Sequence, residues 1–171
     1  MSTLPLSELC RRCGLCCDGN LFSHVPLQPA EVDAARRNGL EVVALADGAP
    51  ALRQGCTALK GRQCSIYAER PEGCRRYACR LFNALAGGTV PFEEALQVVE
   101  QAHALLAAVE RGLAPDTDPR PTSVLERARF AAWGEEGGFS SETSAARERA
   151  EAFLDQHFHG GPRRFEGSGQ G

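Results

Sequence analysis

Eight cysteines confined to residues 10 to 79 constrain this chain of 171 residues more than any other feature of its sequence. Four of them form the run C-x-x-C-x-x-C-C, and the other four follow at wider intervals. In a chain that stays reduced, cysteines at such short, repeated spacings are typical of metal ligands. The candidate ligands are Cys10, Cys13, Cys16, Cys17, Cys56, Cys64, Cys74 and Cys79.

The N-terminal segment and the overall charge bear on compartment and partners. Residues 1 to 10 have no basic region followed by an apolar run, so we expect no signal peptide. No stretch approaches the roughly 18 apolar residues that a membrane span requires. The formal net charge of −3 indicates no nucleic-acid partner. We therefore expect a cytoplasmic chain without membrane contact, in which thiols persist and structural disulfides are rare.

The spacing of the first four cysteines is compatible with more than one metal site. Two residues between thiolates let both sulfurs converge from a tight turn, and Gly14 relaxes the backbone where it bends. A distant fourth cysteine would complete either a [4Fe–4S] cluster or a tetrahedral zinc site. The adjacent side chains of Cys16 and Cys17 are expected to diverge, so one of them serves a second metal or supports the site. Eight thiolates suffice for two four-sulfur sites, and the spacing leaves their partition open.

Basic residues accompany the downstream cysteines. Seven cations lie between Ala51 and Arg80, against only two glutamates. They would lower thiol pKa values and neutralise a thiolate–metal site, or they form an ordinary solvated basic face.

Sequence periodicity predicts short elements before residue 88 and longer helices after it. We expect a short helix over 29–38, a strand over 41–46, a hairpin over 57–67 and a helix over 71–85. On one continuous helix, Cys74 and Cys79 would point about 140° apart, and both would reach one metal only if its first turn were irregular. Further helices are predicted over 91–111, 123–133 and 144–158, with a proline-rich linker over 114–122.

These elements predict an α+β fold that is mainly helical. A small, irregular, cysteine-rich metal-binding unit with short strands occupies residues 1–88, and a helical extension over 89–159 packs on it. Residues 160–171 read as a disordered tail. The helical extension is a candidate surface for a protein partner.

The histidines and the motif content limit the chemistry. His103 lies on the apolar face of its helix and is interpreted as a packed core residue, whereas His157 and His159 are interpreted as surface residues. His24 is close enough in sequence to serve as a substitute ligand. The chain has no phosphate-binding loop, nucleophile elbow or H-E-x-x-H motif, so no enzymatic activity is predicted or excluded.

A family resemblance rests on three segments. These are the run from Cys10 to Cys17, the Cys-Ser-Ile-Tyr segment beginning at Cys64, and the Arg-Pro-x-x-Cys-Arg-x-Tyr segment ending at Tyr77. Together they resemble the YkgJ-like CxxCxxCC cysteine-cluster family, described as a "putative zinc- or iron-chelating domain", over roughly residues 7–82. The resemblance implies that every candidate cysteine except Cys79 belongs to the family pattern.

The function predicted from the sequence is metal binding, with zinc or iron held by clustered thiolates and a [4Fe–4S] cluster as one form. Two alternatives stay open. One is an iron–sulfur redox or methyl-transfer enzyme, because flagellin lysine N-methylase has a similar cluster. The other is a metal chaperone with exchangeable thiolates, with which the adjacent Cys16 and Cys17 are compatible.

Overall fold

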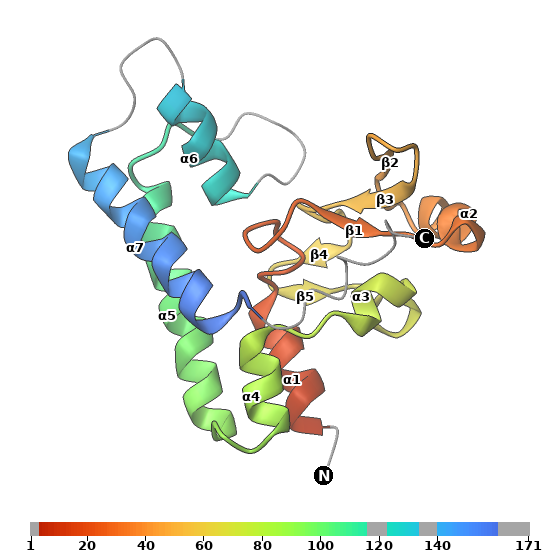
Figure 1. The fold of residues 1–171 in the computed structure, drawn as a ribbon, viewed down its shortest axis with the longest axis horizontal. Helices are drawn as coiled ribbons and strands as arrows, with labels where there is room; N and C mark the ends of the chain where they lie inside the picture. The colour runs from red at the N-terminus through yellow and green to blue at the C-terminus, as the bar shows by residue number, and fades with distance from the viewer. Residues whose placement is uncertain (1–3, 116–122, 134–139, 161–171) are drawn as a thin grey trace.

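The computed structural model describes residues 4–115, 123–133 and 140–160 (Figure 1). Most of the predicted tail and most of the predicted linker lie outside these residues. The described chain is mainly helical with short strands, which confirms the predicted fold class. Its elements in order are α1 (Leu4–Cys13), β1 (His24–Pro26), α2 (Val32–Arg37), β2 (Val42–Ala44), β3 (Pro50–Arg53), β4 (Leu59–Lys60), β5 (Gln63–Cys64), α3 (Glu72–Arg76), α4 (Arg80–Ala86), α5 (Phe92–Glu110), α6 (Val124–Trp133) and α7 (Ser141–His157), with 3₁₀ turns at Pro29–Glu31 and Tyr67–Glu69.

The long helices lie close to their predicted positions, and local signals account for where they begin. Two acidic residues in the first turn of α5 complement the positive end of the helix dipole. The hydroxyl of Ser140 caps α7 by accepting a hydrogen bond from the backbone N–H of Thr143, so α7 begins three residues before its predicted start. The buried positions of α5 recur at intervals of three or four residues, as an amphipathic helix requires; they are Ala95, Val99, Ala102, Leu106 and Val109.

Two small antiparallel sheets lie in the cysteine-rich half. The larger has the strand order β1-β3-β2, and β4 pairs with β5 in a hairpin. The turn between β2 and β3 contains Gly48 at φ +84°, a conformation that glycine adopts without strain. The strand predicted over 41–46 and the hairpin predicted over 57–67 are therefore both present, although each is shorter than predicted. Strands β1 and β3 were not predicted.

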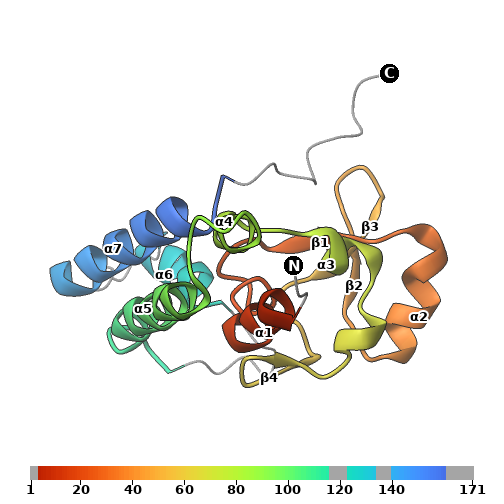
Figure 2. The ribbon, with the colours of Figure 1, turned by 90° about the horizontal axis from the view of Figure 1, so that it is seen from below.

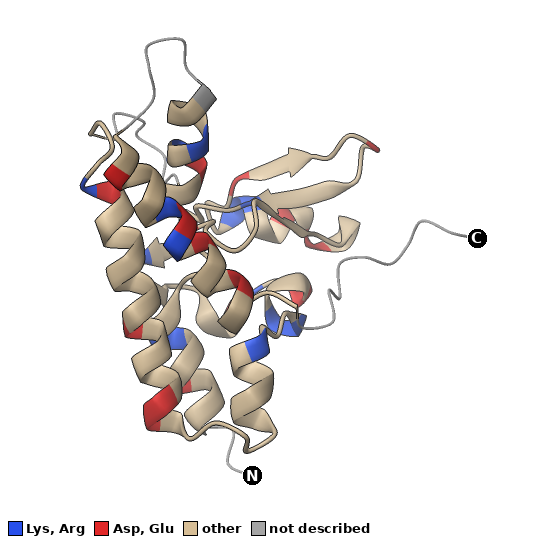
Figure 3. Cartoon of the chain, turned by 60° about the vertical axis from the view of Figure 1, so that its left-hand side comes forward, with Lys and Arg blue, Asp and Glu red and all other residues tan. Residues whose placement is uncertain are grey.

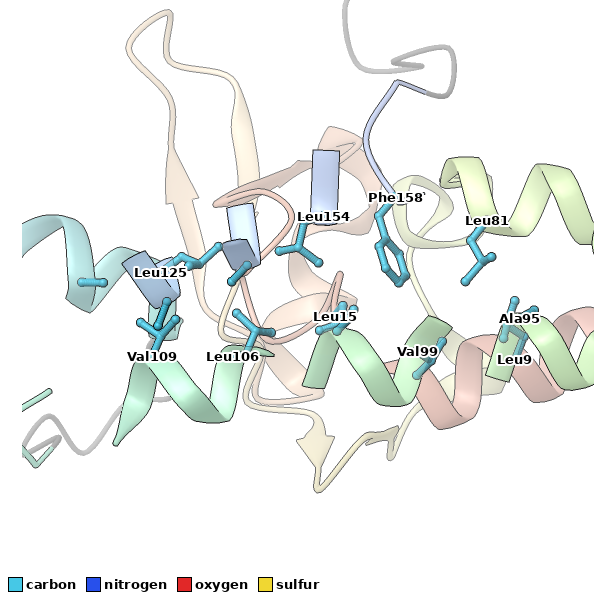
Figure 4. Packing of buried hydrophobic residues seen from close by; sticks show 14 residues of the cluster. Leu9, Leu15, Leu81, Ala95, Val99, Leu106, Val109, Leu125, Leu154 and Phe158 are labelled. Atoms are coloured by element: carbon cyan, nitrogen blue, oxygen red, sulfur yellow. The ribbon is translucent and has the colours of Figure 1, made fainter. Parts of the chain in front are cut away.

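Two hydrophobic cores organise the described residues. The sheet core forms between the larger sheet and α2; its buried members are Val25, Leu27, Ala35, Leu40, Leu52 and Ala58. The helical core forms around α5, α6 and α7. It also buries Leu9 of α1, Leu81 of α4, and Leu15, which follows α1 (Figure 4). Helix α1 lies between the long helices and the small sheets (Figure 2). The helical half thus shares one core with the segment that carries the first four cysteines.

Acidic and basic residues are interspersed along the helices (Figure 3). Among the residues that the structure describes, no helix is both long enough and apolar enough to cross a membrane.

Candidate metal centre

The first two cysteines lie on a helix rather than in the predicted tight turn. Cys10 and Cys13 are the first and the last of the final four residues of α1, and their spacing of three places them on one helix face. Helix α1 ends at Cys13, and the next residue, Gly14, has a φ of +70°, so the chain bends at this glycine as predicted. The backbone N–H groups of Cys17 and Asp18 both donate to the carbonyl of Gly14 at 2.9 Å. This turn carries Cys16 and Cys17 back toward α1.

The side chains of Cys16 and Cys17 were expected to diverge, but they do not. Their Sγ atoms are 3.8 Å apart. The backbone also ties this pair to a downstream cysteine, because the N–H of Cys56 donates to the carbonyl of Cys17 at 2.8 Å. Cys64 lies in β5 opposite Leu59, and β5 is packed close to α1. These contacts place Cys56 and Cys64 close to the first four cysteines.

The predicted helix over 71–85 is wrong in one respect, because it is broken at residues 77–79. Helix α3 ends at Arg76, and Cys79 is the N-cap of α4, its Sγ accepting the N–H of Phe82 at 3.3 Å. The N–H of Arg80 donates to the carbonyl of Phe158 at 3.0 Å, which fixes the start of α4 against the end of α7. The break removes the geometric objection to Cys79, since it no longer shares a helix with Cys74.

The break and the chain reversal bring seven of the eight cysteines to the wall of one cavity of about 270 Å³. These seven are Cys10, Cys13, Cys16, Cys17, Cys64, Cys74 and Cys79. Cys56 lines a neighbouring cavity of about 40 Å³. Four cysteines line both cavities, and these are Cys16, Cys17, Cys64 and Cys74. All eight thiols are free and partly buried. The sequence-predicted site residues are thus gathered in one region of the molecule.

Burial and mutual repulsion disfavour the thiolate form in the metal-free protein. Burial and, after it, the charge of Cys79 raise the pKa of the Cys10 thiol to about 11. Burial likewise raises the pKa of Cys74 to about 12, with smaller contributions from the charges of Cys17 and Cys56. A bound cation would reverse this balance by neutralising the clustered thiolates.

Backbone donors act in the opposite direction. Burial raises the pKa of Cys13, Cys56 and Cys64, while a backbone N–H two residues further along the chain donates to each sulfur and lowers the pKa. Amide donors of this kind stabilise thiolates and tune the metal that thiolates hold. The local backbone therefore supports the charged form of these side chains once a cation is present.

Aromatic and cationic side chains complete the cavity wall, and sequence reasoning gave the two tyrosines no role. The guanidinium of Arg70 lies 3.5 Å from the ring centroid of Tyr67 and lowers the thiol pKa values of Cys10 and Cys74 against the larger effect of burial. Tyr77 lines both cavities. The signal for these residues was the pair of segments around Cys64 and Cys74 that carry them.

The described geometry can now be compared with known proteins. A family model described as CxxCxxCC, "putative zinc- or iron-chelating domain", matches residues 9–99, just over half of the chain. The chain belongs to this family. The CxxCxxCC match extends beyond the predicted 7–82 and includes the first part of α5 up to Val99. Neither the curated proteins nor the solved structures contain a match to the chain.

None of the four histidines, all of which the structure describes, lines the two cavities that the CxxCxxCC cysteines line. Nε2 of His103 donates to the carbonyl of Cys13 at 2.7 Å, so this half-buried side chain fastens α5 to the end of α1. His24 is exposed on β1 and lines neither cavity. His159 is half-buried rather than exposed, and its Nε2 donates to the carbonyl of Leu21 at 3.0 Å.

The donor set of this CxxCxxCC domain fits zinc or iron in chemistry and number. Thiolates are the ligands of structural zinc sites and of iron–sulfur clusters, and both take four. Within the described ranges, no three Cys, His, Asp or Glu side chains are already arranged to hold one metal ion. Because the raised pKa values keep the free thiols neutral, the sulfurs have to deprotonate and draw closer when they bind a metal.

Proposed function

We propose that this protein binds zinc or iron through its eight cysteine thiolates. The observation that carries the proposal is the convergence of cysteines from α1, β5 and the two ends of the break between α3 and α4 on one cavity. Buried thiols gathered at this density repel one another once ionised, which a metal cation relieves. Ordinary structural thiols have no need of such an arrangement, since isolated buried cysteines pack as small hydrophobic residues.

The volume of the larger cavity supports a group bigger than a single ion. Water occupies about 30 Å³ per molecule in the liquid, so a cavity of about 270 Å³ has the volume of several water molecules. A single zinc ion, with its four sulfurs at roughly 2.3 Å, would fill only a small part of this cavity. We therefore propose a polynuclear iron–sulfur group as the form that best fills this cavity. Such a group would supply reversible electron storage.

The residues around the thiols have identifiable roles in holding such a group. Arg70 would offset part of its negative charge, because the guanidinium already lowers thiol pKa values in the metal-free protein. The backbone N–H of Phe82 would hydrogen-bond to the Cys79 sulfur, as it does to the thiol. Tyr67, Tyr77 and Phe82 would shield the sulfurs from water on the apolar part of the wall.

Anaerobic purification followed by metal analysis, acid-labile sulfide analysis and absorption spectroscopy tests this function. We expect a coloured protein with iron and sulfide in comparable amounts. A colourless protein with stoichiometric zinc and no sulfide would retain metal binding and refute the cluster. A metal-free protein that takes up neither zinc nor iron on reconstitution would refute the function as a whole.

A further inference from the structure

Five of the eight cysteines pack against one of two different hydrophobic cores. Cys13 and Cys79 pack against the helical core, in contact with the group that includes Leu9, Leu15 and Leu81. Three other cysteines pack against the sheet core, and these are Cys56, Cys64 and Cys74. The division does not follow chain order, since Cys79 joins the first cysteines rather than its neighbour Cys74. It results from the break between α3 and α4, which sends the two side chains to opposite sides.

The two cavities divide the cysteines in the same way. Cys10, Cys13 and Cys79 line only the larger cavity, on the side of α1 and α4. Cys56 lines only the smaller one, whose wall includes Leu40 and other members of the sheet core. The remaining four line both cavities and therefore lie where the two meet.

Within the shared set, Cys64 and Cys74 are assigned to the sheet side by their packing. Cys16 and Cys17 form the junction, with their sulfurs 3.8 Å apart. The carbonyl of Cys17 accepts the N–H of Cys56, which holds the Cys17 backbone beside a sheet-side cysteine, and we group the Cys17 thiol with that side. Cys16 is then left with the helix side.

We propose that the cysteines form two four-thiolate metal centres, a helix-side centre of Cys10, Cys13, Cys16 and Cys79 and a sheet-side centre of Cys17, Cys56, Cys64 and Cys74. This inference rests on the proposed function and adds the ligand set of each centre. Four thiolates complete the shell of a zinc ion or of one iron–sulfur cluster, so each set is sufficient by itself. The larger cavity belongs to the helix-side centre, and the smaller cavity, of about 40 Å³, has room for little more than one ion.

A matched pair of variants tests the partition, because Cys74 and Cys79 are close in sequence but belong to different centres. We expect Cys79→Ser and Cys74→Ser each to lose one centre's metal and keep the other's, and the double variant to lose both. Metal per chain is measured by elemental analysis, and far-UV circular dichroism checks that each variant is folded. A folded single variant that loses all metal, or none, would overturn the partition.

The wild-type chain provides a test that does not depend on substitution. Metal-free protein is loaded with Zn²⁺ to one equivalent and alkylated, and chains with four protected thiols are isolated by mass and mapped. We expect protection of one set of four or the other, never of a mixture. Mixed sets, or chains that pass from zero to eight protected thiols with no intermediate, would overturn the partition. Wild-type protein in which no thiol is protected at any Zn²⁺ concentration would refute the proposed function itself.

Discussion

Leu15 connects the cysteine run to the helical core, and its replacement separates packing from metal binding. It lies between Cys13 and Cys16, its side chain is 0% exposed, and it packs beside Val99 and Leu106 (Figure 4). Leu15→Ala removes three buried carbon atoms, which at about 0.8 kcal/mol each amount to roughly 2.4 kcal/mol. The cavity left behind raises the expected loss to about 3–4 kcal/mol.

Leu154→Ala is the matched control for this prediction. Leu154 is 1% exposed in the same core, but it belongs to α7, outside the cysteine run, and lines neither cavity. We expect both variants to lose a similar free energy of unfolding, measured by urea denaturation followed by circular dichroism. Only Leu15→Ala should also lower the metal content per chain, because Leu15 holds the turn that carries Cys16 and Cys17. A loss below about 1 kcal/mol for Leu15→Ala, or equal metal content in the two variants, would refute the reasoning.

Three further predictions concern the glycines and the thiols. Gly14→Ala and Gly61→Ala each place alanine at positive φ, at a cost of about 1 kcal/mol. Only at Gly14 would the new Cβ meet a neighbour, the Arg62 carbonyl oxygen at 2.9 Å. Elemental analysis should therefore show metal loss for Gly14→Ala alone, and equal metal losses in the two variants would contradict this prediction. Gly73→Ala would place a Cβ 2.6 Å from the Pro26 carbonyl oxygen and push α3, with Cys74, off β1, so it should lower metal content more than Gly87→Ala, whose nearest contact is 3.3 Å. In the metal-free protein, folding raises thiol pKa values above 9.0, as for Cys10, so the thiols of the unfolded chain ionise at lower pH than those of the folded chain. The free energy of unfolding should therefore be constant below about pH 9 and fall above it. Equal urea midpoints at about pH 7 and about pH 10 would contradict this prediction.

The parts of the fold that the sequence predicts are those specified by local patterns. The stripe on α5 is long and strongly periodic, and Gly112 follows its C-terminus, so its type and limits are close to the prediction. Helix α1 was missed because its last turn consists of cysteines and arginines in a spacing that equally suits a metal-binding turn. Strands β1 and β3 are only three and four residues long, too short for alternation to be recognised.

The break after α3 depends on contacts that no local pattern records. Residues Tyr77 to Cys79 contain neither glycine nor proline, so the sequence gives no reason to end a helix there. The break is stabilised by the Cys79 cap on α4 and by the hydrogen bond from Arg80 to Phe158, which lies far along the chain. For the same reason, the spacing of the cysteines identified the candidate ligands but left open which of them lie together.

The most direct test of metal binding compares the wild type with Cys13→Ser, both purified without oxygen and analysed for zinc and iron. Cys13 lies at the centre of the cysteine run, faces the larger cavity and receives a backbone N–H at its sulfur. We predict stoichiometric zinc or iron in the wild type and a clear loss in the variant. A wild type without either metal, or a variant that retains its full metal content, would contradict the account.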